Sequence, residues 1–195
     1  MNVEYELVRA YFEENGFWVR QQEALPQVSK KKSIFPFFEI FKTVNSVDEP
    51  LRSFRLFTGD LAKLSSAMFC LLGWQDSGFS NDLLTSDAKL IKFFRKHIES
   101  QKIIWSADDS SSLLMDRQFI LIVPALPKSE NKALELYDFF RSIGVNGVLT
   151  LSSVLENLLR NTHVNVDSRG NSTFHLLRLL KAYGLATEPQ LDIFG

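Results

Sequence analysis

The sequence Phe119-Ile120-Leu121-Ile122-Val123 is an uninterrupted apolar run that is followed at once by a proline. Ser129 is then a candidate helix N-cap, and apolar residues recur at helical spacing until Gly144. A second apolar run covers residues 145–151, and Ser152 is the candidate N-cap of the helix that follows it. A strand, a helix and a strand joined by short connections predict two parallel strands linked by a right-handed crossover.

The pattern on either side of residues 119–151 extends this unit into a larger α/β fold. Strand-like apolar runs cover residues 17–21, 34–44, 53–57 and 67–74, and helical spacing covers residues 5–14, 81–98, 152–161 and 172–183. We expect a three-layer α/β fold, in which helices flank a mixed β-sheet. Pro36 predicts that the strand at residues 34–44 either lies at an edge of the sheet or begins its regular pairing late. Three parts are expected: an α/β domain at residues 1–151, a helical extension packed on it at residues 152–185, and a tail at residues 186–195.

Composition limits the class of protein without naming a function. The chain has 195 residues and 17 phenylalanines, which indicates a core rich in aromatic rings. Its 22 basic and 23 acidic residues give a net charge of -1, so the overall field does not attract a polyanion. Cys70 is the single cysteine and lies in an apolar run, which predicts a small buried side chain.

The sequence predicts a protein that does not interact with a membrane. No apolar stretch approaches the ~20 residues that cross a bilayer. The first residues, which are acidic and amphipathic, are unlike a signal peptide. We therefore expect a cytoplasmic location.

Glu39 is the one carboxylate that the strand pattern places in the middle of an apolar strand, where burying its charge would be unfavourable. It lies between Phe38 and Ile40, where burial of a charge requires compensation. One interpretation makes Glu39 a metal ligand or an acid–base group. The other, which the imperfect alternation favours, puts it on the solvated face of an edge strand.

The order of elements carries a family resemblance. A helix ending at residues 13–16, a strand at residues 17–21, a long strand, and the apolar strand at residues 67–74 resemble the restriction-endonuclease-like nuclease domains. The resemblance covers residues 3–126 and implies a core of one helix, three strands, a helix and a strand. Active members carry one acidic residue on the second strand and an acidic-x-Lys triplet on the third, and these hold Mg²⁺ for phosphodiester cleavage.

This chain matches the family pattern only in part. Glu39 stands where the first acidic residue would be, but residues 69–73 contain neither a carboxylate nor a lysine. The resemblance therefore implies a degenerate, non-catalytic relative with no cofactor. An active nuclease would need Mg²⁺ and carboxylates gathered from elsewhere, such as Glu39, Asp48, Glu49 and Asp60.

The last residues resemble a second known pattern. Gln190-Leu191-Asp192-Ile193-Phe194 is similar to the pentapeptide that bacterial DNA-processing proteins insert into the DNA sliding clamp. In such a complex the three apolar side chains would fill an apolar cleft while the glutamine forms hydrogen bonds at its entrance. The other interpretation is that Leu191, Ile193 and Phe194 fold back onto the domain itself.

Local clusters of positive charge give candidate contacts to nucleic acid. These candidates are Lys30, Lys31 and Lys32 in a predicted loop, and Lys92, Arg95 and Lys96 on a predicted helix. Together these patterns predict a non-catalytic, nuclease-like protein that acts beside DNA or a DNA-processing partner. An active Mg²⁺-dependent nuclease and an oligomeric scaffold remain alternatives.

Overall fold

The computed structural model describes residues 3–22, 37–42, 51, 53–99, 118–163 and 172–186, and these form an α/β fold around a five-stranded mixed sheet. The strands are β1 (Trp18–Gln22), β2 (Phe37–Phe41), β3 (Ser66–Leu71), β4 (Gln118–Val123) and β5 (Gly147–Thr150). They are arranged in the order β1-β2-β3-β4-β5. The first three strands pair antiparallel, and β4 and β5 continue the sheet parallel to β3.

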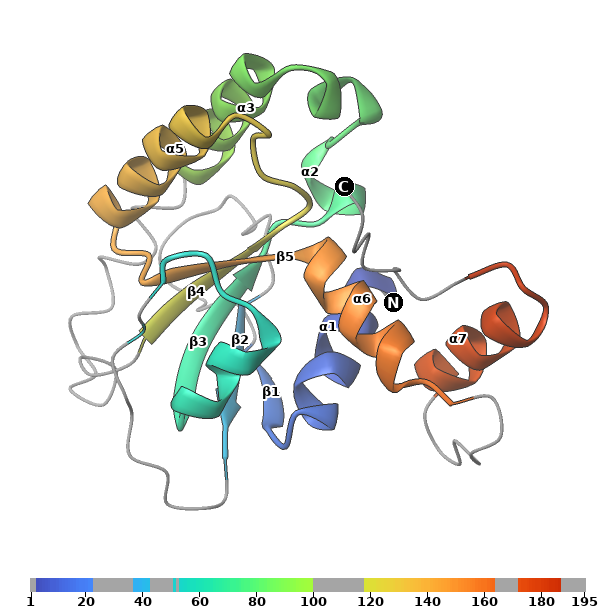
Figure 1. Cartoon of the computed structure of the whole chain (residues 1–195). Helices are drawn as coiled ribbons and strands as arrows, with labels where there is room; N and C mark the ends of the chain where they lie inside the picture. The colour runs from blue at the N-terminus through green and yellow to red at the C-terminus, as the bar shows by residue number, and fades with distance from the viewer. Residues whose placement is uncertain are drawn as a thin grey trace, which may run out of the picture.

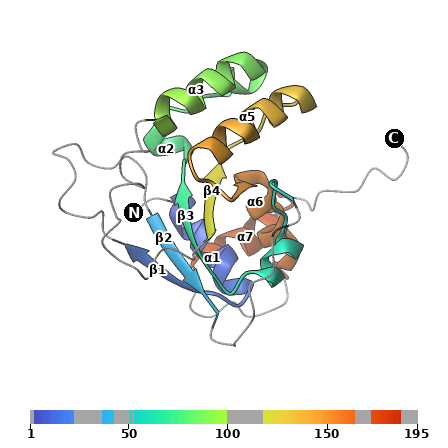
Figure 2. The same ribbon diagram turned by 90° about the vertical axis from the view of Figure 1, so that its left-hand side faces the viewer.

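Helices cover both faces of this sheet (Figures 1 and 2). The helical segments are α1 (Val3–Glu14), η1 (Thr58–Lys63), α2 (Trp74–Ser77), η2 (Asn81–Thr85), α3 (Asp87–Glu99), α5 (Glu130–Ser142), α6 (Leu151–Asn161) and α7 (Ser172–Ala182). Helices α3 and α5 lie side by side on one face, while α1 and α6 lie on the other with α7 beyond them. The α/β class expected from the sequence is confirmed.

The unit β4–α5–β5 forms as its sequence predicts, with two corrections at its end. Both strands are parallel, and Ser129 occupies the N-cap position of α5. The second strand stops at Thr150, however, and Leu151 already belongs to α6. Thr150, not Ser152, caps α6, because its side-chain oxygen accepts the N–H of Ser153 at 3.2 Å.

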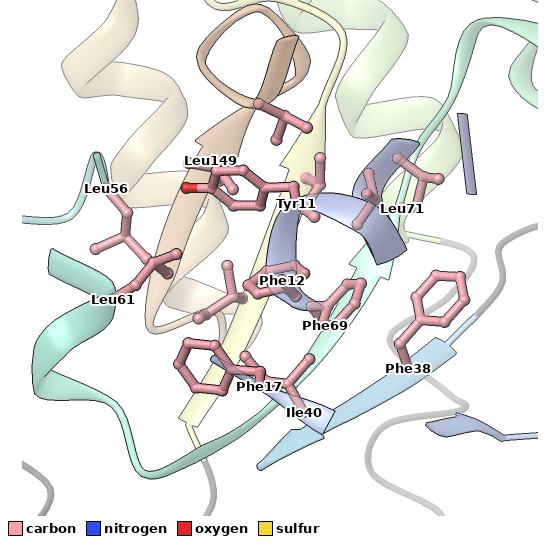
Figure 3. Close-up of a cluster of buried hydrophobic side chains, with 14 of the residues drawn as sticks. Tyr11, Phe12, Phe17, Phe38, Ile40, Leu56, Leu61, Phe69, Leu71 and Leu149 are labelled. Atoms are coloured by element: carbon pink, nitrogen blue, oxygen red, sulfur yellow. The ribbon is translucent and has the colours of Figure 1, made fainter. Parts of the chain in front are cut away.

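The core on the α1 side of the sheet is a run of contacting aromatic rings (Figure 3). Phe69 on β3 stacks against Phe38 of β2 at 4.7 Å between ring centroids, and Phe12 of α1 lies 4.6 Å from Phe69. Tyr11, also on α1, is fully buried, and its hydroxyl lies 3.2 Å from the Thr58 hydroxyl. Burial raises the pKa of Tyr11 to about 12.

A second aromatic cluster fills the space under α3 and α5. Phe93 and Phe94 of α3 contact Phe79 and Phe140, respectively, at 5.5 and 5.7 Å between centroids. Successive side chains of β3 point to opposite faces of the sheet, so β3 contributes to both clusters: Phe69 faces α1, and Cys70 faces α3 and α5. The phenylalanine excess thus supplies two cores. Cys70 is fully buried, as expected, and this burial raises the pKa of its thiol.

Four details expected from the sequence differ in the structure. β2 pairs with strands on both sides, so it is not an edge strand. The helical pattern at residues 81–98 divides into η2 and α3 at Ser86. The expected strand at residues 67–74 ends at Leu71, and Trp74 begins α2. The predicted strand at residues 53–57 forms, with the described residues, one isolated bridge, between Arg55 and Val148 of β5.

Helices α6 and α7 share the core on the α1 side. Val154, Leu158 and Leu177 belong to the same buried cluster as the sheet residues. The Lys181 ammonium of α7 donates hydrogen bonds to the carbonyls of Leu159 and Thr162, at the C-terminal end of α6. The division into residues 1–151 and 152–185 stays a prediction. Within the described part of the chain, no helix has the length and apolar character needed to span a bilayer.

Candidate functional site

Glu39 lies in the middle of β2, on the sheet face opposite α1. Its neighbours across the two adjacent strands are Arg20 on β1 and Met68 on β3. The residue is only 5% exposed, and its Oε2 lies 2.7 Å from Nη2 of Arg20, whose own side chain is 67% exposed. The favoured expectation of a solvated carboxylate on an edge strand is therefore wrong. An interior strand buries Glu39, and the Arg20 guanidinium compensates its charge.

The surroundings of Glu39 do not fit a magnesium site of the nuclease type. Such a site needs carboxylates that converge on one ion. β3, which would carry the other ligands, is Ser-Ala-Met-Phe-Cys-Leu and has neither a carboxylate nor a lysine. Within residues 3–22, 37–42, 51, 53–99, 118–163 and 172–186, no three His, Cys, Asp or Glu side chains gather closely enough to hold a metal ion.

Of the other carboxylates considered for an active nuclease, the structure describes Asp60, which is already engaged by a lysine and a backbone amide. Asp60 is held at the start of η1, where it accepts hydrogen bonds from Lys63 Nζ at 2.8 Å and from the Phe57 amide at 3.1 Å. The bond from Lys63, more than any other interaction, lowers the pKa of Asp60. Asp48 and Glu49 lie outside the described residues.

Glu4 is a buried carboxylate that the sequence analysis did not single out. It is 9% exposed and reaches from α1 to the start of α2, where it accepts the amide N–H groups of Trp74 at 2.6 Å and Gln75 at 3.2 Å. A Cβ on Gly73 would overlap the Glu4 carboxylate. These contacts make Glu4 a structural residue that ties α1 to α2.

The basic residues predicted on α3 separate into two kinds. Arg95 is engaged: its guanidinium pairs with Glu135 of α5 at 3.1 Å and lies 5.5 Å from the Phe139 ring centroid. Lys92 and Lys96 are exposed, and Lys89 shares their side of the helix at i, i+3 and i+7 spacing. None of these lysines forms an ion pair with a described residue.

We define Lys89, Lys92 and Lys96 as the α3 lysine stripe, which presents three exposed lysines on one side of a helix. Lys89 was not among the predicted contacts, although its spacing from Lys92 and Lys96 would have indicated it. The predicted loop contacts Lys30, Lys31 and Lys32 lie outside the described residues, as does the pentapeptide Gln190–Phe194.

No protein-family model, curated protein or solved structure matches this chain. The functional argument therefore depends on the geometry described above and on the sequence patterns.

Proposed function

We propose that this chain is a non-catalytic protein with a restriction-endonuclease-like core, and that it acts beside DNA together with a DNA-processing partner. The order of α1, β1, β2, β3, α3 and β4 supports the core assignment. It follows the helix, three strands, helix and strand that the resemblance implies. The antiparallel β1–β2–β3 meander, joined in parallel to β4, agrees with that order.

The ion pair between Glu39 and Arg20 is the observation that carries the non-catalytic part of the proposal. Metal-assisted hydrolysis of a phosphodiester needs an ion that polarises the phosphate and activates water. At the corresponding strands this chain presents one carboxylate against a guanidinium, with Met68 on the other side. A cation there would be repelled by Arg20 and would find no second carboxylate on β3.

The α3 lysine stripe supports a position beside DNA. Three exposed ammonium groups on one side of a helix can contact successive phosphates without reading bases. The interaction would be local, because the net charge of the whole chain is -1.

The pentapeptide Gln190–Phe194 supports the choice of partner. Three apolar side chains at alternating and adjacent positions of a short segment suit an apolar cleft, and Gln190 adds a donor and an acceptor. The partner that this pattern indicates is a sliding clamp of the bacterial type.

Isothermal titration calorimetry of the full chain with a bacterial sliding clamp tests the proposal. We expect heat of binding from the unsubstituted chain and none from the Gln190→Ala/Phe194→Ala variant. Gln75→Ala/Leu134→Ala is the matched control, because it removes the same kinds of group from exposed positions outside the tail. Equal binding by all three proteins, or binding by none, would remove the clamp from the proposal.

A further inference from the structure

Helix α7 carries an apolar surface that no described residue covers. Leu176, Leu179 and Tyr183 are 52%, 40% and 77% exposed, and their i, i+3 and i+7 spacing puts them on one side of the helix. Leu185, just past the helix, is 75% exposed. We call these four residues the α7 apolar stripe. The opposite side of α7 is already used, because Leu177 is buried in the core.

The backbone after α7 turns back toward the last turn of the helix. Gly184 has a φ of 68°, the Leu185 N–H donates to the carbonyl of Leu180 at 2.8 Å, and the Gly184 N–H donates to the carbonyl of Lys181 at 3.0 Å. This is the pattern of a Schellman motif, which ends a helix at a left-handed glycine. Ala186, the last described residue, therefore lies beside the last turn of α7, since its N–H also reaches the carbonyl of Leu180, at 3.2 Å.

The residues that follow have the length needed to return along α7. Residues 187–195, extended, span about 30 Å. From Tyr183 back to Leu176 the stripe spans about 10 Å, because each helical residue rises 1.5 Å. Pro189 allows a turn before the pentapeptide, and Gln190 to Phe194 in extended form span about 13 Å. The two apolar segments thus match in length.

We propose that Leu191, Ile193 and Phe194 dock on the α7 apolar stripe of the same chain. The inference concerns the pentapeptide named under the proposed function but does not depend on the clamp being its partner. Any protein that takes this pentapeptide must first displace it from α7, so the stripe sets the affinity of the tail for its partner.

Paramagnetic relaxation measured on the full chain tests the docking. A nitroxide attached at Gly195→Cys is selective, because the one native cysteine, Cys70, is fully buried. We expect a several-fold loss of NMR intensity for Leu176, Leu179 and Tyr183. Leu134, which is 49% exposed on α5 across the sheet, is the reference that stays unchanged. Adding Leu191→Asp/Phe194→Asp to the labelled chain should restore the α7 signals.

Two results would overturn the proposal. The first is an intensity loss on α7 no larger than that of Leu134. The second is the same loss in a mixture of spin-labelled chain and isotope-labelled, unsubstituted chain, because this would assign the tail to a second copy. Neither result depends on the sliding clamp.

Discussion

Glu39 and Arg20 form an ion pair whose two members differ greatly in exposure. The Glu39 side chain is 7% exposed and that of Arg20 is 67% exposed, at an N–O distance of 2.7 Å. Arg9 and Glu13 of α1 form a pair of the same length in which both side chains are well exposed, at 46% and 39%. The comparison isolates the effect of burying one carboxylate.

Arg20→Met keeps the length of the side chain and removes its charge. We expect the free energy of unfolding to fall by about 1–3 kcal/mol, the loss typical of a charged hydrogen bond to a buried group. Arg9→Met, the control, should cost about 0.3–0.5 kcal/mol, because an exposed pair one helical turn apart contributes little. Urea unfolding measures both, and equal losses would contradict a special role for Glu39.

Glu4 stabilises the structure through two backbone amides that are distant in sequence. Glu4→Ala removes the acceptor of the Trp74 and Gln75 N–H groups. We expect the free energy of unfolding to fall by about 1–3 kcal/mol, because the two N–H groups would stay removed from water without a hydrogen-bond acceptor. Glu6→Ala, two residues further along the same helix, is the control. A loss no greater than that of the control would show that these bonds contribute little.

At the scale of the element, Asp87 connects the start of α3 to the start of α5. Its carboxylate accepts the N–H groups of Lys128 at 3.0 Å and Ser129 at 2.9 Å. These two bonds, the one from Ser129 first, hold the pKa of Asp87 below its usual value. A lowered pKa in the folded state gives stability above the unfolded pKa of about 4, and that stability is lost as the pH falls through the folded pKa.

Asp87→Asn should therefore matter more at neutral pH than in acid. We expect the difference in unfolding free energy between the unsubstituted chain and Asp87→Asn to narrow as the pH falls from 7 to 3. Asp60 and Glu135 also have lowered pKa values, so the variant keeps part of the acid sensitivity. Urea unfolding at several pH values provides the measurement, and a constant difference would contradict it.

If the α3 lysine stripe contacts DNA, its lysines determine part of the salt dependence of DNA binding. Lys92→Gln/Lys96→Gln should weaken the binding of duplex DNA to the same extent whatever the DNA sequence. Because two phosphate contacts are lost, the slope of the logarithm of the association constant against the logarithm of the salt concentration should decrease in magnitude by about 2. Arg9→Gln/Arg160→Gln removes the same charge from α1 and α6 and should leave the slope unchanged. Fluorescence anisotropy over a salt series measures both, and equal slopes would exclude α3 as the contact.

Elements with a strong local pattern could be predicted from the sequence, and their junctions could not. The run at residues 119–123 and the helix after Ser129 are set by local periodicity. The Thr150 cap was misplaced because Ser152 and Ser153 have side chains equally able to cap a helix. The end of β3 was misplaced because Trp74 continues the apolar run, while its amide bonds to Glu4, 70 residues earlier.

In the candidate site, contacts between residues that are distant in the sequence could not be predicted. Alternation could place Glu39 and Arg20 on faces of their strands, but it could not give the β1–β2 register that sets them opposite each other. The burial of Glu39 was missed because Pro36 suggested an edge strand. Arg95 was counted as a phosphate contact because its partner, Glu135, lies on a different helix.

At the scale of the whole molecule, the two aromatic clusters on opposite faces fix the sheet and hence the position of Glu39. Phe38 and Ile40 point into the cluster under α1, so Glu39 must point to the other face. There the Arg20 guanidinium meets it. We propose that this arrangement belongs to a nuclease-like core that lacks metal-dependent chemistry.

Incubation of the full chain with plasmid and single-stranded DNA, with and without Mg²⁺ or Mn²⁺, tests that claim most directly. The account predicts that the DNA stays intact in every condition and that Glu39→Gln behaves like the unsubstituted chain. Metal-dependent cleavage by the unsubstituted chain that Glu39→Gln abolishes would contradict it.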